Sequence, residues 1–324
     1  MRHLISALSL MLVVASASGQ SLPVFEFVLD SGQNAAQTAD LVKSRLAAAG
    51  FQVLSNQAVG KDADCTGNVR VISAWHPDAV EPLFNLNAGT APYALVDRIA
   101  VFEDENGTHV AAIHAGSLWR TVLLDHPRAG QLASDHRSML RRALSADLAD
   151  GFGQDRAEGL IGKTMGVMAG GPFDGKLESV LSHDGTDVAA VAEAISARFN
   201  TPRGDWGMKL AWRVDLDARD MVVFGVTSAS MEARSFSIVG AGSDKDRQDL
   251  TCPGTAYAAA YPIELVVRKK DGRVVIETVD AMFRMKMFFE DAGKWAFMKN
   301  MTMPGSLASE IKARLGFALD RSAL

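Results

Sequence analysis

Two hairpin patterns, one in each half of the 324-residue chain, constrain its fold more than any other feature. In the first, apolar runs flank Glu105-Asn106-Gly107, and in the second they flank Lys270-Asp271-Gly272. Asn-Gly and Asp-Gly between two apolar runs are strong signals for a β-hairpin. Gly107 and Gly272 lie 165 residues apart, and the flanking runs align at nearly the same offset. The chain is therefore predicted to contain one structural plan twice.

The elements expected around the hairpins repeat in the same order. In the first half, apolar patterns predict strands at 24–29, 69–74, 99–102 and 110–113 and helices at 34–49, 78–86 and 129–148. In the second half, they predict strands at 177–181, 221–226, 265–267 and 274–279 and helices at 187–199 and 307–319, the last capped by Ser306. Such repetition indicates an internal duplication. Consecutive strands in hairpins indicate an α+β fold with two similar domains, each a mainly antiparallel sheet covered by helices.

The N-terminus has the pattern of a cleaved secretory signal, in which Arg2 and His3 precede an apolar run from Leu4 to Val14 and small residues follow. The run is too short to cross a bilayer, which needs about 20 apolar residues. We therefore expect a periplasmic or secreted protein with no integral membrane segment after cleavage. The expected division of the chain is a signal peptide at 1–20, a first domain at 21–150, a glycine-rich linker at 151–175 and a second domain at 176–324.

The net charge limits the kinds of partner that the chain can bind, and the cysteine content limits the disulfides that it can form. The formal net charge is −5 and no long basic run is present, which argues against a nucleic-acid partner. The chain has two cysteines, Cys65 and Cys252. An oxidising compartment favours a disulfide where the geometry permits one. The sequence leaves two alternatives open: a bridge that joins the two halves, or two isolated buried thiols.

A methionine-rich segment near the C-terminus is the strongest candidate for a special chemistry. Six of the 14 methionines form two copies of the spacing Met-x-x-Met-x-Met, namely Met282, Met285, Met287, Met298, Met301 and Met303. The uncharged, soft thioether sulfur suits Cu(I). We therefore treat these six residues as candidate metal ligands with copper as the metal. The second triplet has no aliphatic counterpart in the first half and is predicted to be an exposed loop.

Two other interpretations of the methionines stay open. Methionine is a flexible core filler, and residues 283–289 alternate as a half-buried strand does. At the positions aligned with the first triplet, the first half has Leu118, Thr121 and Leu123. Methionine-rich surfaces also bind apolar ligands or partner helices because they repack easily. Neighbouring aromatic residues such as Trp295 suit a surface of this kind, for a small ligand, a protein partner or self-association.

Sequence signatures of catalysis are absent. The chain contains no G-x-S-x-G, no H-E-x-x-H and no C-x-x-C. A site assembled from both halves would leave no such signature. We therefore assign no catalytic residues and expect a binding or interaction function.

Short motifs resemble the bacterial domain of unknown function 302 (DUF302) family. In the first half these are Gly50-Phe51 after a helix, His76-Pro77 after a strand, and the Asn106-Gly107 hairpin. In the second half they are Tyr261-Pro262 and the Asp271-Gly272 hairpin. The resemblance covers most of the chain that follows the signal, and it implies a small α+β fold with a helix-covered antiparallel sheet.

The second half departs from the family pattern, with Phe199-Asn200 and Ser230-Met231 where Gly-Phe and His-Pro should stand. The resemblance carries over no catalytic residues, because the family has none assigned. The sequence therefore predicts an exported tandem-domain protein that binds a ligand or a soft metal without catalysis through its methionine-rich segment. The alternative is a module for protein–protein interaction or self-association that uses the methionine and aromatic surface.

Overall fold

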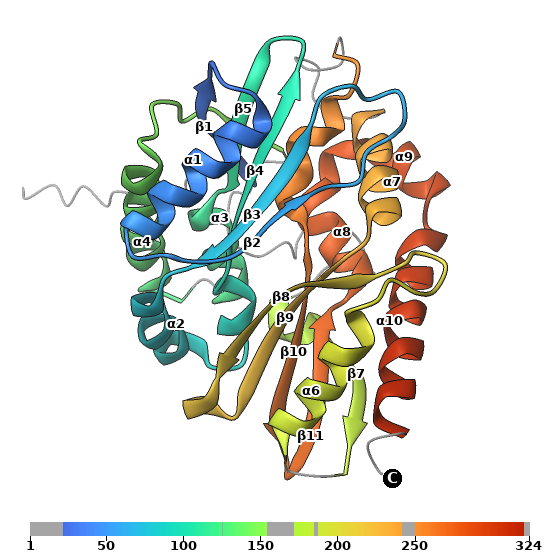
Figure 1. Ribbon diagram of the computed structural model, residues 1–324. Helices are drawn as coiled ribbons and strands as arrows, with labels where there is room; N and C mark the ends of the chain where they lie inside the picture. The colour runs from blue at the N-terminus through green and yellow to red at the C-terminus, as the bar shows by residue number, and fades with distance from the viewer. Residues whose placement is uncertain (1–21, 125, 154–171, 185–186, 242–249, 321–324) are drawn as a thin grey trace, which may run out of the picture.

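The computed structural model describes residues 22–124, 126–153, 172–184, 187–241 and 250–320. The expected signal peptide and most of the glycine-rich segment 151–175 lie outside these ranges. The described chain forms two antiparallel sheets with helices packed against them, so the α+β prediction is confirmed (Figure 1). Within the described residues, no helix combines the length and the apolar character needed to cross a membrane.

The two sheets repeat one strand order. The first has the order β2-β3-β4-β5-β1-β6 and the second the order β8-β9-β10-β11-β7. The first-sheet strands are β1 (Phe25–Ser31), β2 (Gln52–Ala58), β3 (Val69–Trp75), β4 (Asp97–Asp104), β5 (Gly107–Ile113) and β6 (Gly151–Phe152). The second-sheet strands are β7 (Leu177–His183), β8 (Lys209–Leu216), β9 (Met221–Thr227), β10 (Ile263–Lys270) and β11 (Arg273–Val279). Apart from the short edge strand β6, each strand of the first sheet has a counterpart in the second.

The helices occupy matching places between these strands. In the first half they are α1 (Ala35–Ala48), α2 (Val80–Asn87), α3 (Ala115–Val122) and α4 (Ala129–Leu144). In the second half they are α6 (Val188–Phe199), α7 (Ala229–Gly240), α8 (Ala281–Phe289), α9 (Gly293–Lys299) and α10 (Thr302–Asp320). Asn34 caps α1 by accepting a hydrogen bond of 3.0 Å from the Gln37 amide, and Asp187 caps α6 in the same way.

The two halves share a continuous core. One face of the first sheet is covered by α1 and α4, which pack onto it through a separate cluster of mostly aliphatic side chains (Figure 1). Its other face packs against the second half. There the ring of Phe25 lies 5.4 Å from that of Tyr257 and 6.1 Å from that of Phe288. Burying these large rings at the junction stabilises the association of the halves.

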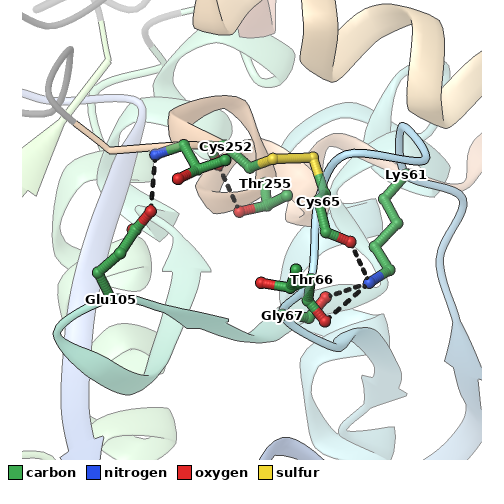
Figure 2. The surroundings of a disulfide bond; sticks show 8 residues. Lys61, Cys65, Thr66, Gly67, Glu105, Cys252 and Thr255 are labelled. Atoms are coloured by element: carbon green, nitrogen blue, oxygen red, sulfur yellow. Dashed lines mark hydrogen bonds between the residues drawn. A yellow bond between two sulfur atoms is a disulfide. The ribbon is translucent and has the colours of Figure 1, made fainter.

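A disulfide also joins the halves (Figure 2). Cys65 and Cys252 are bonded, with their Cα atoms 5.7 Å apart, so the first of the two alternatives is the one the structure contains. Beside the bridge, the Thr251 amide donates a 2.8 Å hydrogen bond to the Glu105 carboxylate. The Lys61 ammonium donates to three successive carbonyl groups from residue 65 to residue 67, which fixes the loop that carries Cys65.

Several local predictions need correction. The sequence patterns did not predict the edge strands β2 and β8 or the helices α3 and α7. Helix α10 begins at Thr302 rather than Leu307, so Ser306 lies inside it and donates a 2.9 Å hydrogen bond to the Met303 carbonyl instead of capping the helix. Helix α4 ends at Leu144, because Ser145 adopts a left-handed conformation.

The alternating segment 283–289 lies in the helix α8 rather than in a strand. The Asp280 side chain starts the helix by accepting a 2.6 Å hydrogen bond from the Phe283 amide. The helix packs between the two halves and is buried on most sides, so its apolar residues show no helical period.

Candidate ligand-binding cavity

An apolar cavity of about 70 Å³ lies in the second half. Its walls come from strands β7, β10 and β11 and from helices α7, α8 and α10, and most of the lining side chains are apolar. One water occupies about 10–15 Å³ on this scale. An engineered cavity of about 150 Å³ holds benzene. The enclosed space here is about half of that, so a single-ring ligand would fill it and extend from it toward solvent.

Two of the six candidate methionines meet at this cavity. Met285 reaches it from α8 and Met303 from the start of α10, so one residue comes from each triplet. Met287 lines a separate cavity of about 10 Å³, together with Val24 and Leu118 of the first half. Residues two apart on a helix differ by about 200° in direction. The first triplet therefore does not converge on one point.

The remaining candidate methionines lie closer to solvent. Met282 is half-buried on α8. The side chain of Met298 on α9 is 58% exposed, and that of Met301, in the turn before α10, is 41% exposed. Trp295 on α9 is 76% exposed. The second triplet is thus partly accessible, but it lies on two helices and their connection rather than in a loop.

Two hydroxyl groups form one polar corner of the cavity. The Tyr261 hydroxyl and the Ser235 hydroxyl are 2.5 Å apart, and both residues line the cavity. Burial raises the pKa of Tyr261 to about 12, so its hydroxyl stays protonated at neutral pH. This corner can donate and accept hydrogen bonds but carries no charge.

A buried arginine contributes a positive charge to the wall. The Arg284 side chain is held by hydrogen bonds from Nη2 to the carbonyl oxygens of Ala260 and Pro262. Its guanidinium lies 5.2 Å from the centre of the Tyr261 ring, close enough for a cation–π interaction. Its Nε lies 3.9 Å from the nearest Glu264 oxygen, which is too far for a hydrogen bond.

Glu264 is shared between two guanidinium groups. Arg98 of β4 forms a direct ion pair with the other Glu264 oxygen and donates a 3.0 Å hydrogen bond to the Pro262 carbonyl. Burial lowers the pKa of Arg98 to about 10; Glu264 counteracts this effect and Arg284 adds to it. The Nε atoms of both arginines lack a hydrogen-bond partner among the described residues. Arg98, Arg284 and Glu264 together therefore carry one positive charge in excess.

Two carboxyl groups lie near the rim. Glu178 lines the cavity from β7, and Asp280 is its hydrogen-bond partner. Desolvation, together with the hydrogen bond and the charge of Asp280, raises the pKa of Glu178. This carboxyl group is mostly exposed, unlike Arg284.

Within the described residues, no group of three or more His, Cys, Asp or Glu side chains is placed to hold a metal ion. The histidines serve structural contacts instead. His136 lies 2.9 Å from Asp97 and stacks on Trp119, while His76 and His114 cap short helices.

Few features of the amino-acid sequence point to this cavity. Tyr261 was visible as part of a Tyr-Pro motif, and no signal in the sequence singled out Arg284. Nothing in the sequence connects these two residues to each other or to Met303, because their meeting at one cavity depends on how the helices pack on the second sheet.

Comparisons with known proteins add one structural likeness. No family model matches the chain, and no curated protein matches it. A similar solved structure is the crystal structure of an uncharacterized conserved DUF302 protein from Bacillus stearothermophilus. The match has 18% sequence identity and a TM-score of 0.34, and it covers 37% of this chain and 95% of that one. That protein carries the name of the family that the sequence motifs resemble, and it is itself uncharacterized.

Proposed function

We propose that the chain is a non-catalytic binding protein that holds a small, mostly apolar ligand in the cavity between α8, α10 and the second sheet. The observation that carries the proposal is that Met285 and Met303, one from each triplet, line the same apolar space. Thioethers adapt their shape to an apolar guest. A ligand of single-ring size gives few contacts, so we expect dissociation constants of about 10 µM to 1 mM.

Export and tandem organisation belong to the same proposal. The N-terminal pattern at 1–20 supports export, and the bond between Cys65 and Cys252 favours an oxidising compartment. The repeated strand order supports a duplication with units at 21–150 and 176–324 and a connecting segment at 151–175. On this proposal the cavity belongs to the second unit.

Benzyl alcohol, a neutral single-ring molecule, tests the cavity as a binding site. Replacing Ala308, which lines the cavity from α10, by Phe should fill the space and weaken binding at least tenfold in calorimetric titrations. Ala313→Phe places the same side chain on an exposed position of α10 and should leave binding unchanged. Thermal unfolding of both variants checks that they fold. No binding by the unmodified chain, or equal binding by Ala308→Phe, would refute the proposal.

Cu(I) binding is a second candidate, favoured by the placement of the second triplet. Met298 and Met301 are exposed, and Met303 follows within the same short segment. Three thioethers are a donor set that Cu(I) accepts. Changing all three to Leu keeps the volume nearly constant and should abolish Cu(I) uptake measured by competition with a chromogenic chelator.

The matched control for copper is the corresponding change of the first triplet. Met285 and Met287 line different cavities, so leucine at 282, 285 and 287 should leave Cu(I) affinity within about twofold. Equal loss in both variants would mean that the triplets act together. Absence of uptake by the unmodified chain would remove copper from consideration.

A further inference from the structure

The wall of the cavity contains a buried cation with incomplete compensation. Arg284 is 5% exposed, and its Nε has no hydrogen-bond partner among the described residues. Moving a guanidinium out of water is costly unless an anion and hydrogen bonds replace the lost hydration. The two carbonyl oxygens that Arg284 contacts supply hydrogen bonds but no negative charge.

The nearby carboxylate is already engaged. Glu264 forms its close ion pair with Arg98 and lies 3.9 Å from the Arg284 Nε at its nearest. Asp97, the other acidic group close to Arg98, is paired with His136 at 2.9 Å. Among the described residues, Arg284 therefore has no carboxylate within hydrogen-bonding distance, and a carboxylate beside it would supply that partner.

We propose that the ligand of this cavity is a small aromatic carboxylate, and that its carboxylate accepts a charge-assisted hydrogen bond from Arg284. This inference rests on the proposed binding function and specifies its ligand class. Guanidinium–carboxylate pairs are strong and directional when water is excluded. The ligand supplies the missing anion, and its ring fills the apolar part of the space.

The lining selects an aromatic ring over an aliphatic chain. Two aromatic residues, Tyr261 and Phe289, and two methionines, Met285 and Met303, line the cavity. Sulfur–aromatic contacts contribute about 0.3–1.5 kcal/mol each. The enclosed volume of about 70 Å³ holds part of a planar ring bearing one carboxylate, and the remainder extends toward solvent.

Acidic side chains near the cavity favour a different class of ligand. Glu178 and Asp280 would attract a cation, so an aromatic amine is the main rival ligand. Glu178 is mostly exposed, and exposed charges are screened by water and salt. Burial of Arg284 makes its charge the stronger determinant, and the raised pKa of Glu178 reduces the opposing negative charge.

Three probes of nearly equal size separate these possibilities: benzoate, benzyl alcohol and benzylamine. In calorimetric titrations of the unmodified chain at pH 7, benzoate should bind at least tenfold more tightly than benzyl alcohol, and benzylamine should bind weakest. If benzyl alcohol binds but benzoate is no tighter, the carboxylate inference fails while the proposed function stands. If benzylamine binds tightest, the carboxyl groups of Glu178 and Asp280 determine the ligand preference and the inference is wrong. If none binds, both proposals fail.

Arg284→Met provides the second measurement. It should remove the preference for benzoate while leaving benzyl alcohol binding within about threefold, because the apolar walls remain. Arg120→Met changes an arginine of α3, which does not line this cavity, and should leave the benzoate preference intact. If Arg284→Met fails to fold, the three-probe comparison on the unmodified chain decides the question. Preserved benzoate preference in folded Arg284→Met would overturn the proposal.

Discussion

Arg98 and Glu264 occupy the same position in the two hairpins, and they form an ion pair with each other. Each lies six residues before the end of the first strand of its hairpin, which is Asp104 in β4 and Lys270 in β10. Both side chains are buried. A duplication that keeps the backbone can place opposite charges at equivalent positions, and here the two charges meet across the junction between the halves.

Because two arginines share one carboxylate, removing Glu264 and removing Arg98 should lower the free energy of unfolding by different amounts. Glu264→Met leaves two buried guanidinium groups without a carboxylate and should lower the free energy of unfolding by about 3–5 kcal/mol. Arg98→Met leaves Glu264 with Arg284 and should cost less, about 1–3 kcal/mol. Urea denaturation of both variants and of the double variant measures the difference and the coupling. Equal costs would contradict the sharing of one carboxylate by two cations.

The sequence allowed the repeated plan to be predicted because its signals are local. Asn106-Gly107 and Asp271-Gly272 each specify a turn by themselves, and Asn34 and Asp187 each mark a helix start. These features depend on a few neighbouring residues and need no tertiary context.

The parts that were missed depend on contacts distant in sequence. Helix α8 is buried between the two halves, so its apolar residues do not mark one face, and its alternation resembled a strand. The charge excess at Arg284 depends on Glu264 and Arg98, and the latter is far away in the chain. The cavity lies within the second half and depends on how α7, α8 and α10 pack on the sheet, and the methionine spacing alone indicated nothing about which of the methionines share a space.

The disulfide predicts a large effect on stability. Cys65 and Cys252 are separated by 187 residues, so the bridge closes a long loop in the unfolded chain. The chain-entropy model gives about 5 kcal/mol for such a closure, and measured effects for native disulfides are about 2–5 kcal/mol. The double variant Cys65→Ser, Cys252→Ser should show this loss in urea denaturation. The packing contacts between the halves remain in that variant, so a change below about 1 kcal/mol would mean that the bridge constrains little.

The two halves pack closely at Gly60, and a substitution there tests this packing. A Cβ atom at this position would lie 1.8 Å from the carbonyl oxygen of Ala229, the first residue of α7. Gly60→Ala should therefore force the junction apart and cost about 1–3 kcal/mol. Gly130→Ala, in α4, meets nothing within 4 Å and should be neutral or stabilising by up to about 1 kcal/mol. A neutral Gly60→Ala would show that the junction yields easily.

Glu232 makes the stability of the same junction depend on pH. Its carboxylate on α7 accepts a 2.7 Å hydrogen bond from the Gly60 amide and another from the Thr227 hydroxyl. Burial raises the pKa of Glu232 to about 7, and these hydrogen bonds offset part of the effect. Because the folded state holds the proton more tightly than the unfolded state, this contribution to stability is complete below pH 4.5 and is lost as the pH rises through about 7.

Glu232→Gln should remove that dependence, since the amide is uncharged and its oxygen can still accept from Gly60. At pH 5 the variant and the unmodified chain should differ little in free energy of unfolding, whereas at pH 8 the variant should be more stable by about 1–3 kcal/mol. Glu193→Gln alters an exposed carboxylate that pairs with Arg213 and should leave the pH profile unchanged. If the unmodified chain and Glu232→Gln give parallel profiles between pH 5 and pH 8, Glu232 is ionised throughout that range. Its burial would then be balanced by the Gly60 and Thr227 hydrogen bonds alone.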